Sequence, residues 1–166
     1  MNASNSDRLS RNFTLGEFTQ SSVAETNGIT IKVETGGAVY ANLQRLCQQI
    51  LQPLRDALGP VRITSGYRPA ELNRIIGGAI GSQHQYGLAA DLQVDGYTPQ
   101  QVAEWIRDHI NGYDQLIHEF GGWVHVSVAP GNKEPRRSCL TAVKDDGHTV
   151  YVSGIHSVED AARKVA

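Results

Sequence analysis

The chain has 166 residues, with 15 lysines and arginines against 17 aspartates and glutamates, so its formal net charge is −2. A length of this order predicts one domain with its own hydrophobic core. The charge balance argues against a nucleic-acid-binding protein, which would carry a basic excess. No apolar run approaches the roughly 20 residues of a transmembrane helix. We therefore expect a protein that binds neither nucleic acid nor membrane, and we expect a monomer.

The N-terminal region is polar. Residues 1–12 lack the apolar stretch of a secretory signal, so we expect synthesis in the cytoplasm and a flexible N-terminal segment. Thr14 followed by Glu17 fits a capping box, which predicts one short helical turn. Cys47 and Cys139 lie far apart and in no metal-binding spacing, so we expect two free thiols.

Helical and strand patterns follow in turn. Between Val39 and Leu58 apolar residues recur at spacings of three and four, which predicts a helix. Pro53 within it predicts a kink near Gln52 or two abutting helices. Further along, patterning and turn residues predict a strand over 61–64, a helix over 69–76, a buried strand over 88–94, a helix over 98–110, hairpins over 115–128 and 138–152, and a short helix from Ser157.

The order of these elements predicts the fold class. Helices dominate the first part of the chain and strands the second, which favours an α+β fold. We expect a single compact domain over residues 13–156. It should have a central antiparallel sheet, with helices packed mainly from the N-terminal part, followed by a tail helix over 157–166.

Two segments carry residues suited to chemistry. In the first, His84 lies in a glycine-bounded loop and Asp91 follows inside an apolar strand. An ionised carboxylate among apolar neighbours is costly unless it is paired or bound to a metal. In the second, His125 lies on a strand with valines at alternate positions. Two imidazoles and one carboxylate are a usual catalytic zinc set, although each residue alone also fits a structural role.

Five motifs along the chain share one resemblance. They are Leu51-Gln52-Pro53-Leu54-Arg55, Ser65-Gly66-Tyr67-Arg68, Ser82-x-His84-x-x-Gly87-x-Ala89-x-Asp91, Asp114-Gln115-Leu116-Ile117-x-Glu119 and Trp123-Val124-His125. Together they resemble the M15 zinc metallopeptidases, the D-Ala-D-Ala carboxypeptidase and peptidoglycan endopeptidase group. The similarity covers roughly residues 13–143 and is closest to short, single-domain members of tailed phages and prophages. It implies a Hedgehog/DD-peptidase-like fold.

The resemblance also implies a metal site. One zinc ion per chain would be held by His84, Asp91 and His125, and it would lower the pKa of a bound water. A general base must then take the proton of that water. Many family members have a Glu three residues before the last His, but that position here is Gly122. Glu119 is the nearest carboxylate, and His118 is the rival base.

The register of the 115–128 hairpin bears on this choice. With a two-residue turn, Glu119 points away from His125 and the rival base faces it. With a three-residue loop over 120–122, Glu119 pairs with Trp123 and shares a face with His125, and polar and apolar side chains separate onto opposite faces. Diagonal neighbours on one face are within side-chain reach. We therefore favour Glu119 as the base.

Three further residues are expected in the site. The resemblance suggests that Arg68 binds a substrate carboxylate or the oxyanion that develops during hydrolysis; a surface arginine or a structural salt bridge is the alternative. Ser82 would bind substrate or hold the loop of His84. Gln115 is a further expected substrate-binding residue.

Together these observations predict a zinc-dependent peptidase that cleaves stem-peptide bonds of peptidoglycan, as a carboxypeptidase or an endopeptidase. We expect a phage lysin, or a virion-associated wall hydrolase, that acts at the bacterial cell wall after release. The competing hypothesis is a non-catalytic, zinc-stabilised wall-binding or structural module on the same fold. Such a module would keep the metal ligands but would need neither Glu119 nor Arg68. A housekeeping bacterial carboxypeptidase is a third hypothesis, against which the missing export signal argues.

Overall fold

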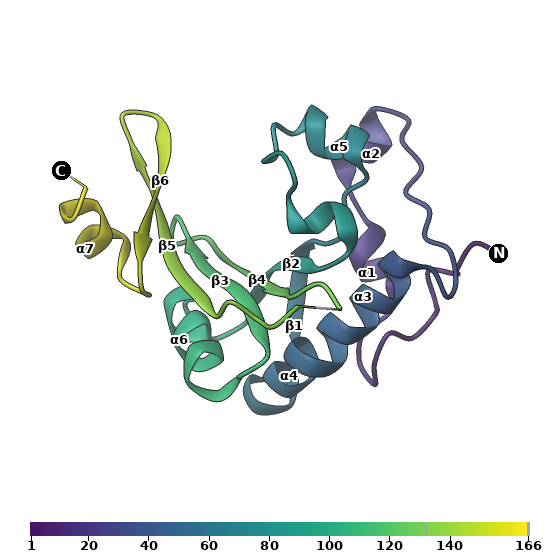
Figure 1. Ribbon diagram of the computed structural model, residues 1–166, viewed down its shortest axis with the longest axis horizontal. Coiled ribbons are helices and arrows are strands. Elements are labelled where there is room, and N and C mark those ends of the chain that lie inside the picture. Colours follow the sequence, from purple (N-terminus) through teal and green to yellow (C-terminus); the bar gives the residue numbers. More distant parts are fainter. Residues whose placement is uncertain (132, 166) are drawn as a thin grey trace.

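Six strands form one mixed sheet at the centre of the computed structural model, which describes residues 1–131 and 133–165 (Figure 1). Their order across the sheet is β1-β2-β4-β3-β5-β6. They are β1 Val61–Ser65, β2 Ala89–Val94, β3 Tyr113–Glu119, β4 Trp123–Val128, β5 Ser138–Asp145 and β6 His148–Ser153. The chain thus adopts the α+β class that its sequence predicts.

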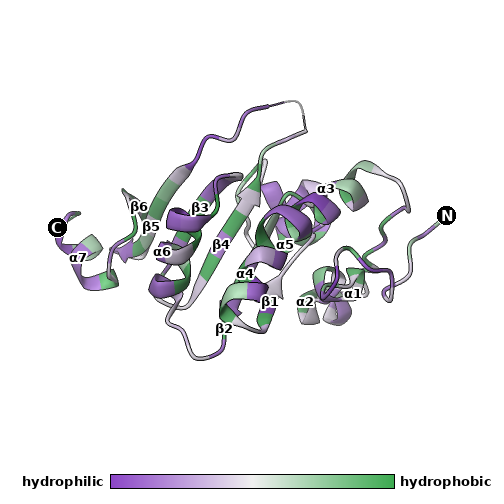
Figure 2. Ribbon diagram, turned by 90° about the horizontal axis from the view of Figure 1, so that it is seen from below, coloured by the Kyte–Doolittle hydropathy of each residue, from purple (hydrophilic) through white to green (hydrophobic). Residues whose placement is uncertain are grey.

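The helices come mostly before the sheet in the chain. They are α1 Leu15–Thr19, α2 Ser22–Thr26, α3 Ala38–Leu46, α4 Gln52–Leu58, α5 Ala70–Ile75, α6 Pro99–His109 and α7 Val158–Arg163, with a short 3₁₀ helix η2 at Gln83–Tyr86. Buried apolar side chains of α3, α4 and α6 meet those of β2, β3 and β4 in the main core. Hydrophobic residues alternate with more polar ones along β4 (Figure 2), so the opposite face of the sheet is left for polar side chains.

The long helix predicted over 39–58 is interrupted. A π-helical segment, η1 Cys47–Leu51, joins α3 to α4. Pro53 lies in the first turn of α4. A proline has no N–H to donate and its ring crowds the preceding turn, so the helix widens just before it. Of the two arrangements predicted, a kink near Gln52 or two abutting helices, the structure has two helices, with α4 beginning at Gln52.

The sheet is mixed rather than antiparallel, which corrects the expected topology. β5 runs parallel to β3, with Gln115 paired to Ser138 and Glu119 to Ala142. The other neighbouring strands are antiparallel. β4 ends beside the first residue of β3, and β5 begins on the side of β3 that faces away from β4. The antiparallel prediction was wrong because β4 and β5 follow each other in sequence but are not neighbours in the sheet.

The N-terminal segment, expected to be flexible, contacts the rest of the domain. Leu9 is buried in the core, the backbone N–H of Ala3 donates to the carbonyl of Val33, and the expected capping box precedes α1. Both cysteines are free thiols, and burial raises the pKa of Cys47. No helix among the described residues is long and apolar enough to cross a bilayer.

Candidate metal centre and active site

A cleft of about 520 Å³ opens on the polar face of the sheet. Residues of β2, β3 and β4 contribute to it, and further residues come from the loop after α5 and from the β5–β6 hairpin. Figure 1 shows these last two parts rising on opposite sides of the sheet. The structure brings all seven site residues of the sequence hypothesis to this cleft: Arg68, Ser82, His84, Asp91, Gln115, Glu119 and His125.

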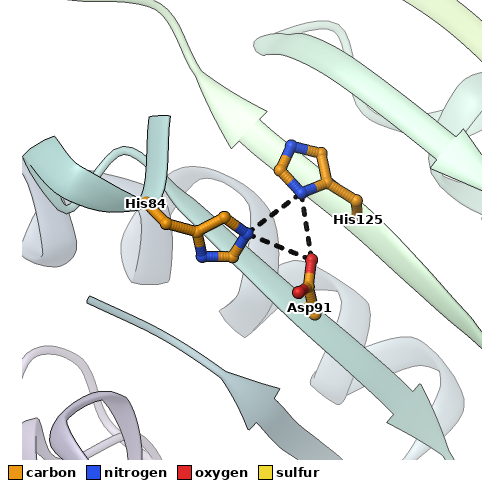
Figure 3. Close-up of side chains that lie close together, drawn as sticks. All are labelled: His84, Asp91 and His125. Carbon is orange, nitrogen blue, oxygen red and sulfur yellow. Dashed lines mark hydrogen bonds and ion pairs between the residues drawn. The ribbon is translucent and has the colours of Figure 1, made fainter. Parts of the chain in front are cut away.

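His84, Asp91 and His125 converge within the cleft (Figure 3). Nε2 of His84 lies 3.2 Å from Oδ1 of Asp91 and 3.2 Å from Nδ1 of His125, and that Nδ1 lies 3.0 Å from the same carboxylate oxygen. Both imidazoles are buried. Three ligand atoms so close together can hold one metal ion and leave a further coordination position open.

Backbone pairing and one tight turn position these side chains. Asp91 and His125 are cross-strand partners on β2 and β4, so they share a face of the sheet. His84 comes from η2, which ends at Gly87 with a φ of 67°. A Cβ at Gly87 would lie 2.8 Å from the carbonyl oxygen of Val39. Glycine therefore lets the turn that carries His84 pack closely on α3.

The hydrogen bonding of His84 suits a metal ligand. Nδ1 of His84 lies 2.7 Å from the carbonyl oxygen of Gly66. A carbonyl only accepts hydrogen bonds, so Nδ1 carries a proton, and Nε2 is the ring nitrogen that faces Asp91 and His125. Burial alone would raise the pKa of Asp91, but the two imidazoles hold it well below its usual range. Metal-binding histidines usually donate their second N–H to such a carbonyl, so the contact with Gly66 fits a metal ligand.

Arg68 reaches the cleft from the turn after β1. Its backbone N–H donates to the carbonyl of His84 over 3.1 Å, which ties it to the turn that carries this ligand. Its Nε is buried and has no partner among the described residues. Burial lowers the pKa of Arg68, whereas the carboxylates of Asp91 and Glu119 favour its charged form. The unused donor can bind an anionic group of a substrate.

The β3–β4 hairpin has the predicted register. Glu119 pairs with Trp123, and Ile117 pairs with His125. The loop turns through Phe120, which has a φ of 55°, and through the glycine after it. The three-residue loop is therefore confirmed, and Glu119 faces the cleft on the same side as His125.

The surroundings of Glu119 suit a proton acceptor. Burial and the charge of Asp91 raise the pKa of Glu119, and His125, Trp123 and Arg68 offset this only in part. A carboxylate with a raised pKa, beside candidate metal ligands, is a typical candidate for acid–base work.

His118 lies on the other face of β3. It is buried, and its Nδ1 donates to the carbonyl oxygen of His156 over 2.9 Å. It is not among the residues of the cleft. The structure therefore separates the rival base from the site.

Two of the expected binding residues are held mainly through their backbone. The carbonyl of Ser82 accepts the N–H of Gln85 over 3.0 Å and so opens the turn that carries His84. The backbone N–H of Gln115 donates to Oγ of Ser127 over 3.0 Å. Both side chains are thus available to a ligand in the cleft.

The cleft is also lined by residues that were not expected in the site, among them Gln83, Arg136, Leu140 and Tyr151. Gln83 lies beside His84, and that position alone could have indicated it. The other three belong to no motif of the sequence. They reach the cleft only because β5 pairs with β3.

Comparison with known proteins agrees with this geometry. A family model described as Peptidase M15 matches residues 11–127. The chain is also 35% identical over 89 residues to the zinc D-Ala-D-Ala carboxypeptidase of Streptomyces albus G, an alignment that covers 50% of this chain and 34% of that protein. The chain therefore matches about a third of the length of this relative. All seven expected site residues lie within the family match, and the chain belongs to the peptidase M15 family.

Proposed function

We propose that the protein is a zinc-dependent peptidase that hydrolyses stem-peptide bonds of peptidoglycan. One observation carries the proposal: a candidate metal-ligand set of two histidines and an aspartate lies in the same cleft as a half-buried carboxylate and a guanidinium. The family membership and the zinc carboxypeptidase relative support it.

The three ligand side chains fit zinc. His84 and His125 offer ring nitrogens and Asp91 offers a carboxylate oxygen, the donor types of catalytic zinc sites. Bound zinc would supply a water of lowered pKa and polarise the scissile carbonyl. The hydrogen bond from His84 to Gly66 would fix the ring so that Nε2 faces the ion.

The remaining residues would act on the substrate and on protons. Glu119 would accept the proton of the attacking water at its carboxylate and pass it to the leaving amine. Arg68 would donate hydrogen bonds to a substrate carboxylate or to the oxyanion that develops on the carbonyl oxygen. Ser82 and Gln115 would orient the peptide.

The biological role that we propose is that of a phage lysin or a virion-associated wall hydrolase, acting at the bacterial cell wall. It rests on the resemblance to short, single-domain phage members of the family. A non-catalytic wall-binding module would require neither Glu119 nor Arg68, and their presence in the cleft with the metal ligands favours the enzyme.

The test is digestion of purified peptidoglycan by the zinc-loaded protein, with mass analysis of the new ends. We expect new amino termini from peptidoglycan and none from casein. Equal cleavage of casein would overturn the substrate class. No cleavage of peptidoglycan at any zinc concentration would favour the binding module.

A further inference from the structure

One end of the cleft carries a second guanidinium, that of Arg136. This residue lies in the connection between β4 and β5, beyond the part of the chain that the family model matches. Its side chain is 59% exposed and lines the cleft. The cleft is therefore lined by two arginines, Arg68 from the turn after β1 and Arg136 from the connection between β4 and β5.

A buried carboxylate fixes the orientation of Arg136. The Asp114 side chain is only 3% exposed. Nη2 of Arg136 lies 2.7 Å from Oδ2 of Asp114, Nε lies 3.0 Å from the same oxygen, and the backbone N–H donates to Oδ1 over 2.9 Å. These contacts leave Nη1 without a hydrogen-bond partner among the residues that the structure describes. A guanidinium held in this way offers its outer edge to a second anion at little cost in side-chain entropy.

The same carboxylate orients Gln83. Nε2 of Gln83 donates to Oδ2 of Asp114 over 2.9 Å. A carboxylate can only accept, so this contact also fixes which end of the amide is the oxygen. That oxygen, Oε1, is buried and has no partner within residues 1–131 and 133–165. Asp114 thus orients two residues that line the cleft, Arg136 with an unused donor and Gln83 with an unused acceptor.

This part of the cleft lies close to the candidate metal. Gln83 immediately precedes His84 in η2. Gln115 follows Asp114 and lies two residues before Ile117, the cross-strand partner of His125. Asp114, which holds Arg136, lies three residues before Ile117, and three residues along a strand correspond to about 10 Å. A peptide with its scissile bond at the metal could therefore extend a neighbouring residue to Arg136.

A donor beside an acceptor matches one feature of a peptide. A residue whose α-carboxylate is free carries that carboxylate next to its own amide N–H. The carboxylate would accept hydrogen bonds from Arg136, and the amide N–H would donate to Gln83. Within an ordinary chain the α-carboxyl is consumed in the peptide bond. The feature therefore occurs only at a C-terminus or at a residue linked through its side chain.

We propose that Arg136 and Gln83 form a second substrate-binding site that selects a residue with a free α-carboxylate. This inference deepens the proposed function and rests on it for the identity of the peptide. Stem peptides offer two sources of that group: the α-carboxylate of a γ-linked glutamate and that of the C-terminal alanine.

The test uses synthetic stem peptides in matched pairs. In one pair the α-carboxylate of the γ-linked glutamate is free or converted to the carboxamide, and in the other pair the C-terminal carboxylate is varied in the same way. We expect the wild-type protein to prefer the free acid in one of the two pairs by about 10- to 100-fold in kcat/KM, the range for a hydrogen bond to a charged group. Arg136→Gln should abolish this preference, mainly through KM.

A neighbouring arginine provides the matched control. Arg137 stacks over the ring of Tyr113 and does not line the cleft, so Arg137→Gln should keep the preference for the acid. Arg136→Lys retains a charge beside Asp114 and should restore part of it. Because the readout is a ratio between two substrates, a variant that is only partly folded still gives a valid answer.

Two results decide the proposal. If Arg136→Gln keeps the wild-type preference in both pairs, or if the wild type shows no preference, the second binding site is refuted. Calorimetric binding of the same pairs to zinc-loaded protein makes the test independent of turnover. Carboxylate-selective binding without cleavage would overturn the proposed peptidase function but support the second binding site. Cleavage without selectivity would support the peptidase function and refute the second binding site.

Discussion

Replacing Glu119 by glutamine isolates the proposed proton acceptor. Glutamine has the same length and can keep the position beside Trp123, but its amide cannot take a proton from water. Glu119 is a diagonal neighbour of His125 across the β3–β4 pair, and such neighbours lie about 7–8 Å apart at the backbone, within reach of a long side chain and one water. We expect turnover to fall by about 10²- to 10⁴-fold, or about 3 to 5 kcal/mol of transition-state stabilisation.

The same substitution has a predictable effect on pH dependence and stability. Burial and Asp91 raise the pKa of Glu119 in the folded protein, so ionisation of this group opposes folding. That penalty grows as the pH rises above the ordinary glutamate pKa, and it disappears in acid. The metal-free Glu119→Gln protein should therefore be at least as stable as the wild type at pH 7 and equal to it at low pH. The acidic limb of kcat/KM, which reports the base of the free enzyme, should be lost.

The assay is release of amino termini from peptidoglycan, with zinc content measured on each sample. Glu119→Gln should keep one zinc per chain, because Glu119 is not among the three proposed ligands. His118→Ala is the matched control. It removes a hydrogen bond to the His156 carbonyl on the other face of β3 and should lower the melting temperature while retaining kcat. Near wild-type turnover in zinc-loaded Glu119→Gln would refute Glu119 as the proton acceptor. Loss of turnover in His118→Ala would assign that role to His118 instead.

Three further changes test the rest of the site. His125→Ala should remove both zinc and activity, measured by metal analysis of the purified protein; full activity in an exhaustively chelated sample would contradict the metal site. Arg68→Lys keeps the charge but not the paired donors, and should lower turnover by about 10²- to 10³-fold; unchanged kcat would leave Arg68 a structural role. Gly66→Ala would place a Cβ 2.5 Å from the backbone of Phe18, so we expect a loss of about 1–3 kcal/mol in the free energy of unfolding. It should also weaken zinc binding by about 10- to 100-fold, because the Gly66 carbonyl orients His84; wild-type affinity in a metal titration would argue against that coupling.

The sequence was sufficient to predict those parts of the site that depend on local patterning. Alternation of polar and apolar residues determined the three-residue loop of the β3–β4 hairpin, because any other register would bury Glu119 among valines. The interruption of the helix before Pro53 was predictable because a proline constrains its own helix. His84 and Asp91 were detectable because a polar residue is conspicuous among glycines and apolar side chains.

What depends on strand order was not predictable. The β4 and β5 sequences are compatible with pairing to each other, and only the packed sheet sets β5 beside β3. Arg136, Leu140 and Tyr151 reach the cleft through that pairing, so no local pattern could assign them. The contact of Asp114 with both Gln83 and Arg136 joins three separate segments, and burial of its carboxylate becomes visible only in the folded chain.

The convergence of the three candidate ligands also has a consequence for chain entropy. His84 and Asp91 are 7 residues apart, and Asp91 and His125 are 34 apart. An ion held by all three closes both loops at once and draws the folding equilibrium toward the native state by mass action. The pairing of β2 with β4 is among the long-range contacts that a chain forms at the greatest entropic cost. Such an ion would stabilise the pairing of β2 with β4 at the centre of the sheet. The rate of amide hydrogen exchange along these two strands would then report the fraction of molecules that hold the ion.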